Sequence, residues 1–317
     1  MSRQVKSHTQ SRLRQLELLI THKLDGLLHG DHLGLVPAGG SEPADGRPYT
    51  HGDDVRRMDW NLTARLGSPH VRTTIADREL ETWLVVDNTA SLDFGTAACE
   101  KRDLALAAAA AFAFLTARQG NRIAGSFFGP AGAGVVPPRP GREAALALLH
   151  RLEMRPRSGE GGGAGAPADP AMSRQAKSHG HSVVTLAEAL RRVRLTARRR
   201  GLIVLISDLL DDSPWPRELR ALGLRHAVVV VDVRDPRESD LPPVGLVMLV
   251  DPETGERLEV HTSDRKLRER FAAAAAEQAE AKARAVRSAG AAHLVLSTDR
   301  DWMMDIVHFV VARRRRR

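Results

Sequence analysis

The sequence has 317 residues, of which 42% are hydrophobic and 27% are charged. This composition suffices for a hydrophobic core and excludes a chain that is disordered throughout. Lys and Arg number 47 against 39 Asp and Glu, so the formal net charge of +8 permits an anionic partner without requiring one. Aromatic residues make up only 4%, which argues against a protein that stacks on RNA bases.

The compartment follows from three further features. A single cysteine, Cys99, excludes an internal disulfide framework and fits a reducing environment. No run of about 18 apolar residues is present, so we expect no membrane span. The N-terminal residues are polar and basic and lack the apolar stretch of a secretory signal. These features predict a cytoplasmic protein.

The first 79 residues read as an extension that precedes the main domain. Leucines at helical spacing predict a helix over residues 10–28, with Gly30 as its stop. Residues 34–46 are rich in Gly and Pro and predict a loop. Residues 47–72 are densely polar. We expect the whole extension to pack on the main domain, because its helix is too short to fold alone.

Residues 80–317 alternate between apolar runs of strand length and helical segments. The predicted strands are 82–86, 122–128, 202–207, 227–231 and 292–296, with a short apolar stretch at 135–136 and a hairpin over 244–261. The predicted helices are 100–118, 142–152, 186–199, 267–288 and 299–312, the last capped by Asp299. Residues 156–182 read as a flexible insertion. This alternation predicts an α/β domain with a doubly wound, mostly parallel sheet.

Aspartates end three of the predicted strands, at Asp87, Asp208 and Asp232. Functional groups of such sheets lie at the carboxyl ends of the strands. Asp87 is followed by two hydroxyl residues at alternate positions, Thr89 and Ser91, and this set suits a hard divalent cation such as Mg²⁺. The alternative is that these hydroxyls cap the next helix.

Two later segments extend this pattern. Thr185 opens a helix, and Asp208 ends the run Ile-Val-Leu-Ile-Ser-Asp. The combined set resembles the metal-ion-dependent adhesion site (MIDAS) of von Willebrand factor type A domains, whose pattern is Asp-x-Ser-x-Ser, Thr, Asp. The resemblance implies that Asp87, Thr89, Ser91, Thr185 and Asp208 bind Mg²⁺, or Mn²⁺ or Ca²⁺ in its place. The sequence departs from the pattern at Thr89, where the family has serine. We expect Asp87 and Asp208 to end adjacent parallel strands.

The polar segment before the first strand carries a longer resemblance. It is similar to the signature of the bacterial "domain of unknown function 58" family, which precedes a von Willebrand factor type A-like region. The matching residues are Arg47, Tyr49, Gly52, Asp53, Asp54, Arg56, Met58, Asp59, Trp60, Ala64, Arg65, Val71 and Arg72. The likeness continues to about residue 312. It implies a non-enzymatic, metal-dependent interaction module that partners a MoxR-type AAA+ ATPase in assembly or chaperone-like work, with an acidic side chain of the partner at the metal.

The same segment has a physical interpretation of its own. Its aspartates and arginines interleave, which predicts a network of ion pairs and hydrogen bonds. The members are Asp53, Asp54, Asp59, Arg56, Arg57 and Arg65. Trp60 would anchor this network on the sheet domain as a buttress. The functional alternative is a second acidic site or a partner surface.

Two rival functions rest on fewer features. An aspartate-based phosphatase or nuclease needs a second carboxylate where Thr89 stands, and no lysine is evident in the sequence for the phosphate. Nucleic-acid binding rests on charge, namely an Arg-rich helix over residues 191–200 and the tail Arg313–Arg317, and we do not expect it without a recognition fold. His179 and His181 lack further zinc ligands. Residues 1–8 recur almost unchanged at 172–179, a repeat to which we attach no structural meaning.

Overall fold

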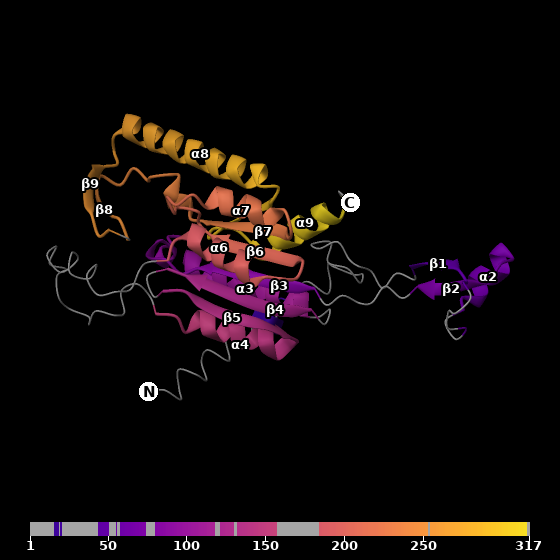
Figure 1. Cartoon of the computed structure of the whole chain (residues 1–317). Helices are drawn as coiled ribbons and strands as arrows, with labels where there is room; N and C mark the ends of the chain where they lie inside the picture. The colour runs from indigo at the N-terminus through magenta and orange to yellow at the C-terminus, as the bar shows by residue number, and fades with distance from the viewer. Residues whose placement is uncertain are drawn as a thin grey trace.

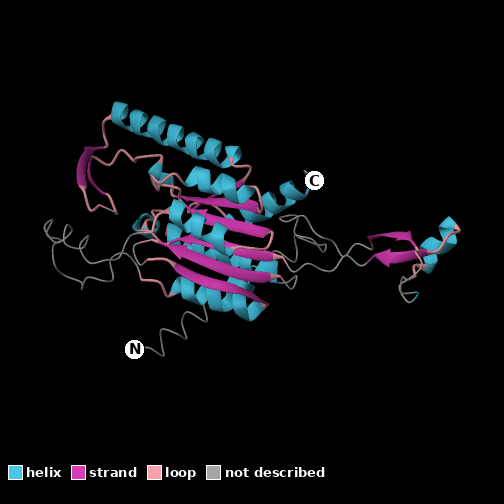
Figure 2. Ribbon diagram, in the orientation of Figure 1, coloured by secondary structure: helices cyan, strands magenta, loops and turns pink. Residues whose placement is uncertain are grey.

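The computed structural model describes residues 16–18, 20, 44–50, 55, 58–73, 80–117, 121–129, 132–156, 184–252 and 254–315. Its main body is a six-stranded sheet with helices on both faces (Figures 1 and 2). In chain order the strands are β3 (Glu81–Asp87), β4 (Arg122–Phe128), β5 (Gly134–Pro140), β6 (Gly201–Ser207), β7 (Ala227–Arg234) and β10 (Ala292–Ser297).

The strand order confirms the doubly wound prediction. The sheet runs β10-β7-β6-β3-β4-β5, which is the order 3-2-1-4-5-6 when the six strands are counted along the chain. All neighbours are parallel except β4 and β5, which pair antiparallel. The prolines of β5 lie at this edge of the sheet, where a missing N–H is tolerated.

Each face of the sheet carries its own hydrophobic core. Leu84 and Val86 of β3 point to one core, and Trp83 and Val85 point to the other, as strand geometry requires. The first core is closed by α3 (Lys101–Ala117), α4 (Arg142–Glu153) and α9 (Trp302–Arg315). The second is closed by α6 (Leu186–Thr196), α7 (Trp215–Gly223) and the end of α8 (Arg265–Ser288). Because both faces are covered, every residue of β3 and β6 is buried.

Helix α3 is buried almost all round, as its alanine-rich sequence predicts. Small side chains let it lie close to the sheet beside α4, and its first residue, Lys101, reaches the carboxyl edge. The predicted start of α9 is wrong by three residues. Asp301, rather than Asp299, accepts hydrogen bonds from the Met303 and Met304 backbone N–H groups, at 3.1 and 3.3 Å.

The predicted hairpin is confirmed as β8 (Leu246–Val250) and β9 (Arg257–His261), which pair antiparallel. It stands beside the start of α8, outside the six-stranded sheet (Figure 1). Short turns named η2 (Ala90–Asp93) and η3 (Pro236–Glu238) follow β3 and β7. In the ranges that the structure describes, no helix combines the length and the apolarity needed to cross a bilayer.

Part of the N-terminal extension packs on the sheet domain. Ile20 is 1% exposed and belongs to the same core as Leu148 of α4. Nearby, the Arg142 guanidinium donates to the Glu17 carboxylate, with its Nη2 2.6 Å from Oε2. These contacts agree with the expectation that the first helix closes on the main domain.

A second part of the extension forms a small unit of β1 (Ala44–Pro48), α2 (Trp60–Leu66) and β2 (His70–Thr73). Asp59 caps α2 by accepting from the Asn61 and Leu62 N–H groups, both at 3.1 Å. Trp60, which we expected to anchor this segment, is 69% exposed. Four further members of the expected network, Asp53, Asp54, Arg56 and Arg57, lie outside the described residues, and Arg65 is exposed on α2. Residues 157–182 of the insertion and the repeated segments 1–8 and 172–179 also lie outside the described residues.

Candidate metal centre at the carboxyl edge of the sheet

Asp87 and Asp208 lie side by side at the carboxyl edge of the sheet. Strands β3 and β6 are adjacent and parallel, and Val86 pairs with Ile206, so Asp87 ends beside Ser207 and Asp208 follows directly. The expectation that both aspartates end neighbouring strands is therefore confirmed. Both are buried, at 4% and 3% exposure.

Asp87 gathers three hydroxyl groups around its carboxylate. Its Oδ1 accepts from the Thr89 N–H at 2.8 Å and from the Thr89 hydroxyl at 2.7 Å. Its Oδ2 accepts from the Ser207 hydroxyl at 2.6 Å. The Ser91 Oγ lies 2.9 Å from the Thr89 Oγ1. Asp87, Thr89 and Ser91 thus converge as the sequence pattern predicts, and Thr89 makes no side-chain cap to η2, so the capping alternative does not hold for this residue.

The Thr185 hydroxyl caps a helix and does not hydrogen-bond to Asp87. It begins α6, and its hydroxyl accepts from the Glu188 N–H at 3.3 Å. The next N–H, that of Leu186, donates to Asp211 Oδ2 at 2.8 Å, which ties the helix start to the segment that follows Asp208. In the described part of the chain, no hydrogen bond joins Thr185 to Asp87 or Asp208. The structure therefore brings four of the five predicted residues together around Asp87 and Asp208, and gives the fifth a capping role beside them.

A buried lysine completes the site and was missed in the sequence. The Lys101 ammonium donates to Asp208 Oδ2 at 2.8 Å and to the Glu238 carboxylate of η3. Lys101 itself is 1% exposed. The signal in the sequence was a lysine that opens a helix whose residues from Leu104 to Leu115 are all apolar, in the segment that follows the Asp-x-Thr-x-Ser turn. From the opposite side, Lys282 of α8 donates to the Asp208 backbone carbonyl at 2.7 Å.

The electrostatics of this edge follow from burial and from close carboxylates. Burial, reinforced by the charge of Asp208, raises the pKa of Asp87 to about 7, against the opposing effect of the Ser207 and Thr89 hydrogen bonds. Burial by itself would lower the pKa of Lys101, but Asp208 and Glu238 outweigh it and raise that pKa above its ordinary value. Lys101 therefore stays protonated, while Asp87, with a pKa of about 7, is about half ionised at neutral pH because its charged form is buried beside Asp208.

The third predicted aspartate is not part of this centre. Strand β7 continues past Asp232 to Arg234, so Asp232 is not a strand end. Burial would raise the pKa of Asp232, but hydrogen bonds from His293 and Arg234 lower it below its ordinary value. Its Oδ2 lies 3.0 Å from the Arg234 Nε and 3.2 Å from the His293 Nε2. Asp232 is thus neutralised by its own partners within the sheet.

Asp235 organises the loops that frame the centre. Its carboxylate accepts from the Thr96 N–H at 2.8 Å, from the Thr96 hydroxyl at 2.6 Å and from the Thr298 hydroxyl at 2.7 Å. It also caps η3 through the Arg237 N–H at 2.9 Å. Because η3 carries Glu238, this network holds the Glu238 carboxylate in reach of Lys101.

The residues at this edge fit a divalent cation. Across the described ranges, no three His, Cys, Asp or Glu side chains group into a metal site, so a cation here depends on hydroxyl ligands. Thr89 and Ser91 supply such hydroxyls next to Asp87. The raised pKa of Asp87 indicates uncompensated negative charge at the point where a cation would bind. This donor set, with oxygen ligands throughout, matches Mg²⁺ or another hard divalent ion.

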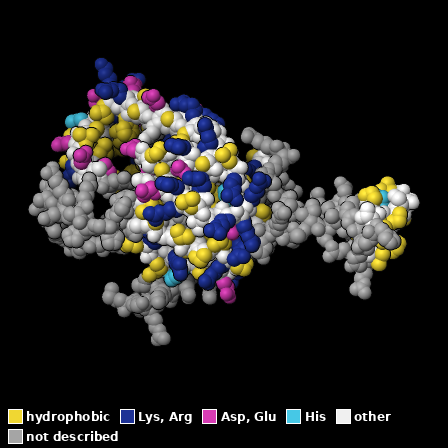
Figure 3. Space-filling view, viewed as in Figure 1, with side chains coloured by type: hydrophobic (Ala, Val, Ile, Leu, Met, Phe, Trp, Pro, Cys, Tyr) yellow, Lys and Arg dark blue, Asp and Glu magenta, His cyan; other side chains and the backbone are white. Residues whose placement is uncertain are grey.

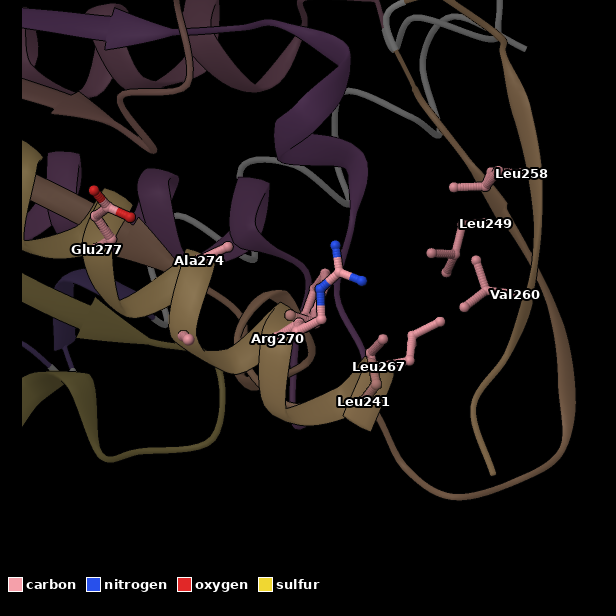
Figure 4. Close-up of a pocket in the computed structure, with 10 residues that line it drawn as sticks. Leu241, Leu249, Leu258, Val260, Leu267, Arg270, Ala274 and Glu277 are labelled. Carbon is pink, nitrogen blue, oxygen red and sulfur yellow. The ribbon is translucent and has the colours of Figure 1, made fainter. Parts of the chain in front are cut away.

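An apolar pocket of about 690 Å³ lies between the β8–β9 hairpin and the first half of α8 (Figure 4). Hydrophobic side chains gather in the same hollow in the space-filling view (Figure 3). Its lining includes Leu249, Leu258, Val260 and Phe271, with Arg270 on α8. The pocket and the centre share helix α8, which carries Lys282 further along.

The arginines of α6 form a solvated basic face. Arg191, Arg192, Arg199 and Arg200 are exposed, and Lys and Arg side chains are spread over much of the side seen in Figure 3. Arg194 pairs with Glu218 of α7 at 3.3 Å. These side chains therefore present positive charge to solvent, and Arg194 is partly paired with α7.

Comparison with known proteins places the chain in a family. Residues 45–281 match the family described as "Protein of unknown function DUF58". Uncharacterized proteins of Mycobacterium tuberculosis (strain H37Rv) and Mycobacterium bovis are each 50% identical over 303 residues, which cover 96% of this chain and 89% of theirs.

Similar solved structures include BatB, a conserved hypothetical protein from Bacteroides thetaiotaomicron, at 11% identity and a TM-score of 0.44 over 74% of this chain and 99% of that chain. They also include the SpRpn10 VWA domain, at 12% identity and a TM-score of 0.38 over 72% of this chain and 93% of that chain. On the match to the family and the identity to the mycobacterial relatives, this chain belongs to the DUF58 family.

Proposed function

We propose that this protein is a non-enzymatic interaction module that binds a partner protein through a divalent cation, Mg²⁺ or in its place Mn²⁺ or Ca²⁺. The observation that carries the proposal is the buried pair of Asp87 and Asp208 on adjacent strands, with the Thr89 and Ser91 hydroxyls beside Asp87. Asp87, Thr89 and Ser91 would hold the cation, with Asp208 and Thr185 next to them. A bound cation would supply an electrophilic centre that accepts a carboxylate oxygen.

The chemistry of the surrounding groups favours binding over turnover. Catalysis at this edge would need a side chain that gives or takes a proton. Asp87, whose pKa is raised to about 7, is the group that could do so, but both of its oxygens already accept hydrogen bonds from Thr89 and Ser207, and in this proposal it is a cation ligand. Lys101 is buried between two carboxylates that keep it protonated, so it is a poor proton carrier. Thr89 stands where an aspartate-based phosphatase needs its second carboxylate, and its hydroxyl is already donated to Asp87.

The partner that we propose is a MoxR-type AAA+ ATPase, which the family resemblance implies. An Asp or Glu of the ATPase would complete the cation's coordination. The apolar pocket between the hairpin and α8 supports a polypeptide partner, because it offers hydrophobic area on the helix that also carries Lys282. The ATPase would then contact both the cation and the pocket.

The experiment is a pull-down of the ATPase with the wild-type protein, with Asp87→Ala and with Asp212→Ala, each with Mg²⁺ and with EDTA. Asp212 is exposed near the same edge and serves as the matched control. We expect Asp87→Ala and EDTA each to abolish association, and Asp212→Ala to retain it. Circular dichroism checks that Asp87→Ala folds.

Association that survives both EDTA and Asp87→Ala would contradict the proposal. A phosphatase or nuclease rate that disappears in Asp87→Ala would instead place the protein among enzymes. Salt-sensitive gel shifts that respond to charge reversal of Arg191 and Arg192, with no ATPase association, would favour nucleic acid.

A further inference from the structure

Lys101 places a permanent positive charge inside the candidate metal centre. Its ammonium lies 2.8 Å from Asp208 Oδ2 and also donates to the Glu238 carboxylate, and the side chain is 1% exposed. A buried ammonium is costly unless it is paired, so these two carboxylates and Lys101 form one built-in unit of the fold. The unit joins the first residue of α3, the end of β6 and the turn η3.

The same aspartate faces the proposed cation. Asp208 follows β6 directly beside Asp87, and the two carboxylates interact electrostatically. Two positive charges therefore interact with the Asp208 carboxylate, the Lys101 ammonium and a cation held by Asp87, Thr89 and Ser91. The interaction with Lys101 is always present because the lysine is part of the chain.

We propose that Lys101 acts as a resident counter-ion that neutralises Asp208, so that a divalent cation at Asp87 keeps positive charge and needs a carboxylate from outside the chain. This inference rests on the proposed function and deepens it: it names the element that makes the site depend on an acidic ligand. Lys101 is a positioning residue in this role, since it acts through Asp208.

The charge count gives the expected direction. With Asp87 ionised, Asp87 and Asp208 carry two buried negative charges beside the cation, and Lys101 reduces their sum to −1, so a bound divalent cation keeps a net charge of +1. Glu238 is left out of this count because its side chain is 30% exposed and contacts only the far side of the pair, at Lys101. Without Lys101 the sum is −2, which the cation balances, so the cation is bound more tightly and has less need of a further anion. Removing one unit charge a few ångströms from the cation changes its affinity by roughly tenfold or more at an effective dielectric constant near 20.

The test is a calorimetric titration of the metal-free full-length protein with MgCl₂, followed by titration of the Mg²⁺-loaded protein with acetate as the carboxylate probe. The variants are Lys101→Met, Lys101→Arg and Lys266→Met, the last removing an exposed lysine of α8 as a control. We expect Lys101→Met to bind Mg²⁺ at least tenfold more tightly and acetate more weakly. Lys101→Arg and Lys266→Met should remain within about threefold of wild type.

A second variant keeps the proposal testable if Lys101→Met fails to fold. Glu238→Gln retains the oxygen that accepts from the Asp235 N–H at 3.0 Å, but it removes the carboxylate that competes for Lys101. Lys101 then pairs with Asp208 alone and neutralises its carboxylate more completely. We therefore expect the Mg²⁺ affinity to drop severalfold, a change opposite in sign to that of Lys101→Met.

The outcomes separate this inference from the proposed function. If the wild type binds Mg²⁺ and Lys101→Met binds it with the same affinity, the inference is overturned and the proposed function stands. If Lys101→Met does not fold, an unchanged Mg²⁺ affinity in Glu238→Gln has the same meaning. No Mg²⁺ binding by wild type with tight binding by Lys101→Met supports the inference and overturns the metal dependence of the function. No binding by any folded variant overturns both.

Discussion

At the scale of single residues, Asp87 is the most constrained group at the carboxyl edge. Its carboxylate is buried beside Asp208 and is held by hydrogen bonds from Thr89 and Ser207. Those bonds orient it, but they do not replace the solvation of a full negative charge. The charged form of Asp87 therefore costs stability, and the cation that we propose would offset this cost.

The first prediction is that Asp87→Asn stabilises the metal-free protein at pH 8 and does so much less at pH 5. The folded-state pKa of about 7 lies above the ordinary value of 3.8. Between these values the folded state holds a proton that the unfolded state has lost, so stability falls as pH rises toward 7 and the penalty is complete above it. At roughly 1.4 kcal/mol per pKa unit the effect is a few kcal/mol.

Urea denaturation in EDTA at both pH values measures this difference, with exposed Asp212→Asn as the control. If Asp87→Asn instead destabilises the protein by equal amounts at pH 5 and pH 8, the prediction is wrong. The loss of the carboxylate's hydrogen bonds would then outweigh the relief of its buried charge.

The second prediction concerns the proposed cation. Protons and Mg²⁺ compete for Asp87, whose pKa is raised to about 7, so the apparent Mg²⁺ affinity should rise by about tenfold from pH 6 to pH 8. Isothermal titration at the two pH values, in buffers of different ionisation enthalpy, also reports the protons released. A pH-independent affinity without proton release would mean that Asp87 is not the ligand.

At the scale of elements, the site depends on how closely β3 and β6 approach. A Cβ atom at Gly201, the first residue of β6, would lie 1.9 Å from the Glu81 carbonyl oxygen of β3. The Glu81 carbonyl belongs to the backbone and cannot move aside as the end of a side chain can. The two strands can therefore approach this closely only because residue 201 is glycine. The spacing of Asp87 and Ser207 at the other end follows from the same register.

The third prediction is that Gly201→Ala lowers the free energy of unfolding by more than about 2 kcal/mol, as overpacking between fixed backbones does. Gly134→Ala in edge strand β5 is the control, because its Cβ would meet a movable Arg155 side-chain end at 3.0 Å. Its effect should stay below about 1 kcal/mol. Thermal melts of both variants test the contrast, and equal losses would refute the close-approach argument.

At the scale of the whole molecule, the chain outside the sheet domain contributes to its core. Ile20 belongs to the cluster that α3, α4 and β3 build, and Glu17 pairs with Arg142 across 125 positions in sequence. The sheet domain is therefore closed by residues that precede it by more than 60 positions. Stability of the domain and presence of the extension are coupled.

The fourth prediction is that Ile20→Ala destabilises the full-length protein by about 2–4 kcal/mol, the range for truncation of a buried aliphatic side chain. Leu18→Ala is the matched control, since Leu18 is 62% exposed on the same helical segment while Ile20 is 1% exposed. Its effect should be within about 0.5 kcal/mol of zero. Equal effects of the two substitutions in denaturant melts would mean that the extension does not pack on the domain.

Local sequence patterns determined most of the architecture of the sheet domain. Apolar runs of strand length can be buried on both faces only in a covered, mostly parallel sheet, so β3, β6 and β7 were predictable from composition and spacing. The convergence of Asp87, Thr89 and Ser91 was also predictable, because a chain that turns directly after a strand, as it does here into η2, brings alternate positions toward one point.

Only the tertiary structure shows which residues from distant parts of the sequence reach the site. Lys101 meets Asp208 and Glu238 across 107 and 137 sequence positions, and no local periodicity encodes such a meeting. Asp232 looked like a third site residue until strand pairing set His293 beside it, and Thr185 proved to cap α6 rather than to contact Asp87. Local spacing fixes which side chains share a turn or a face, but the balance of charge at a site depends on residues that only the folded chain brings together.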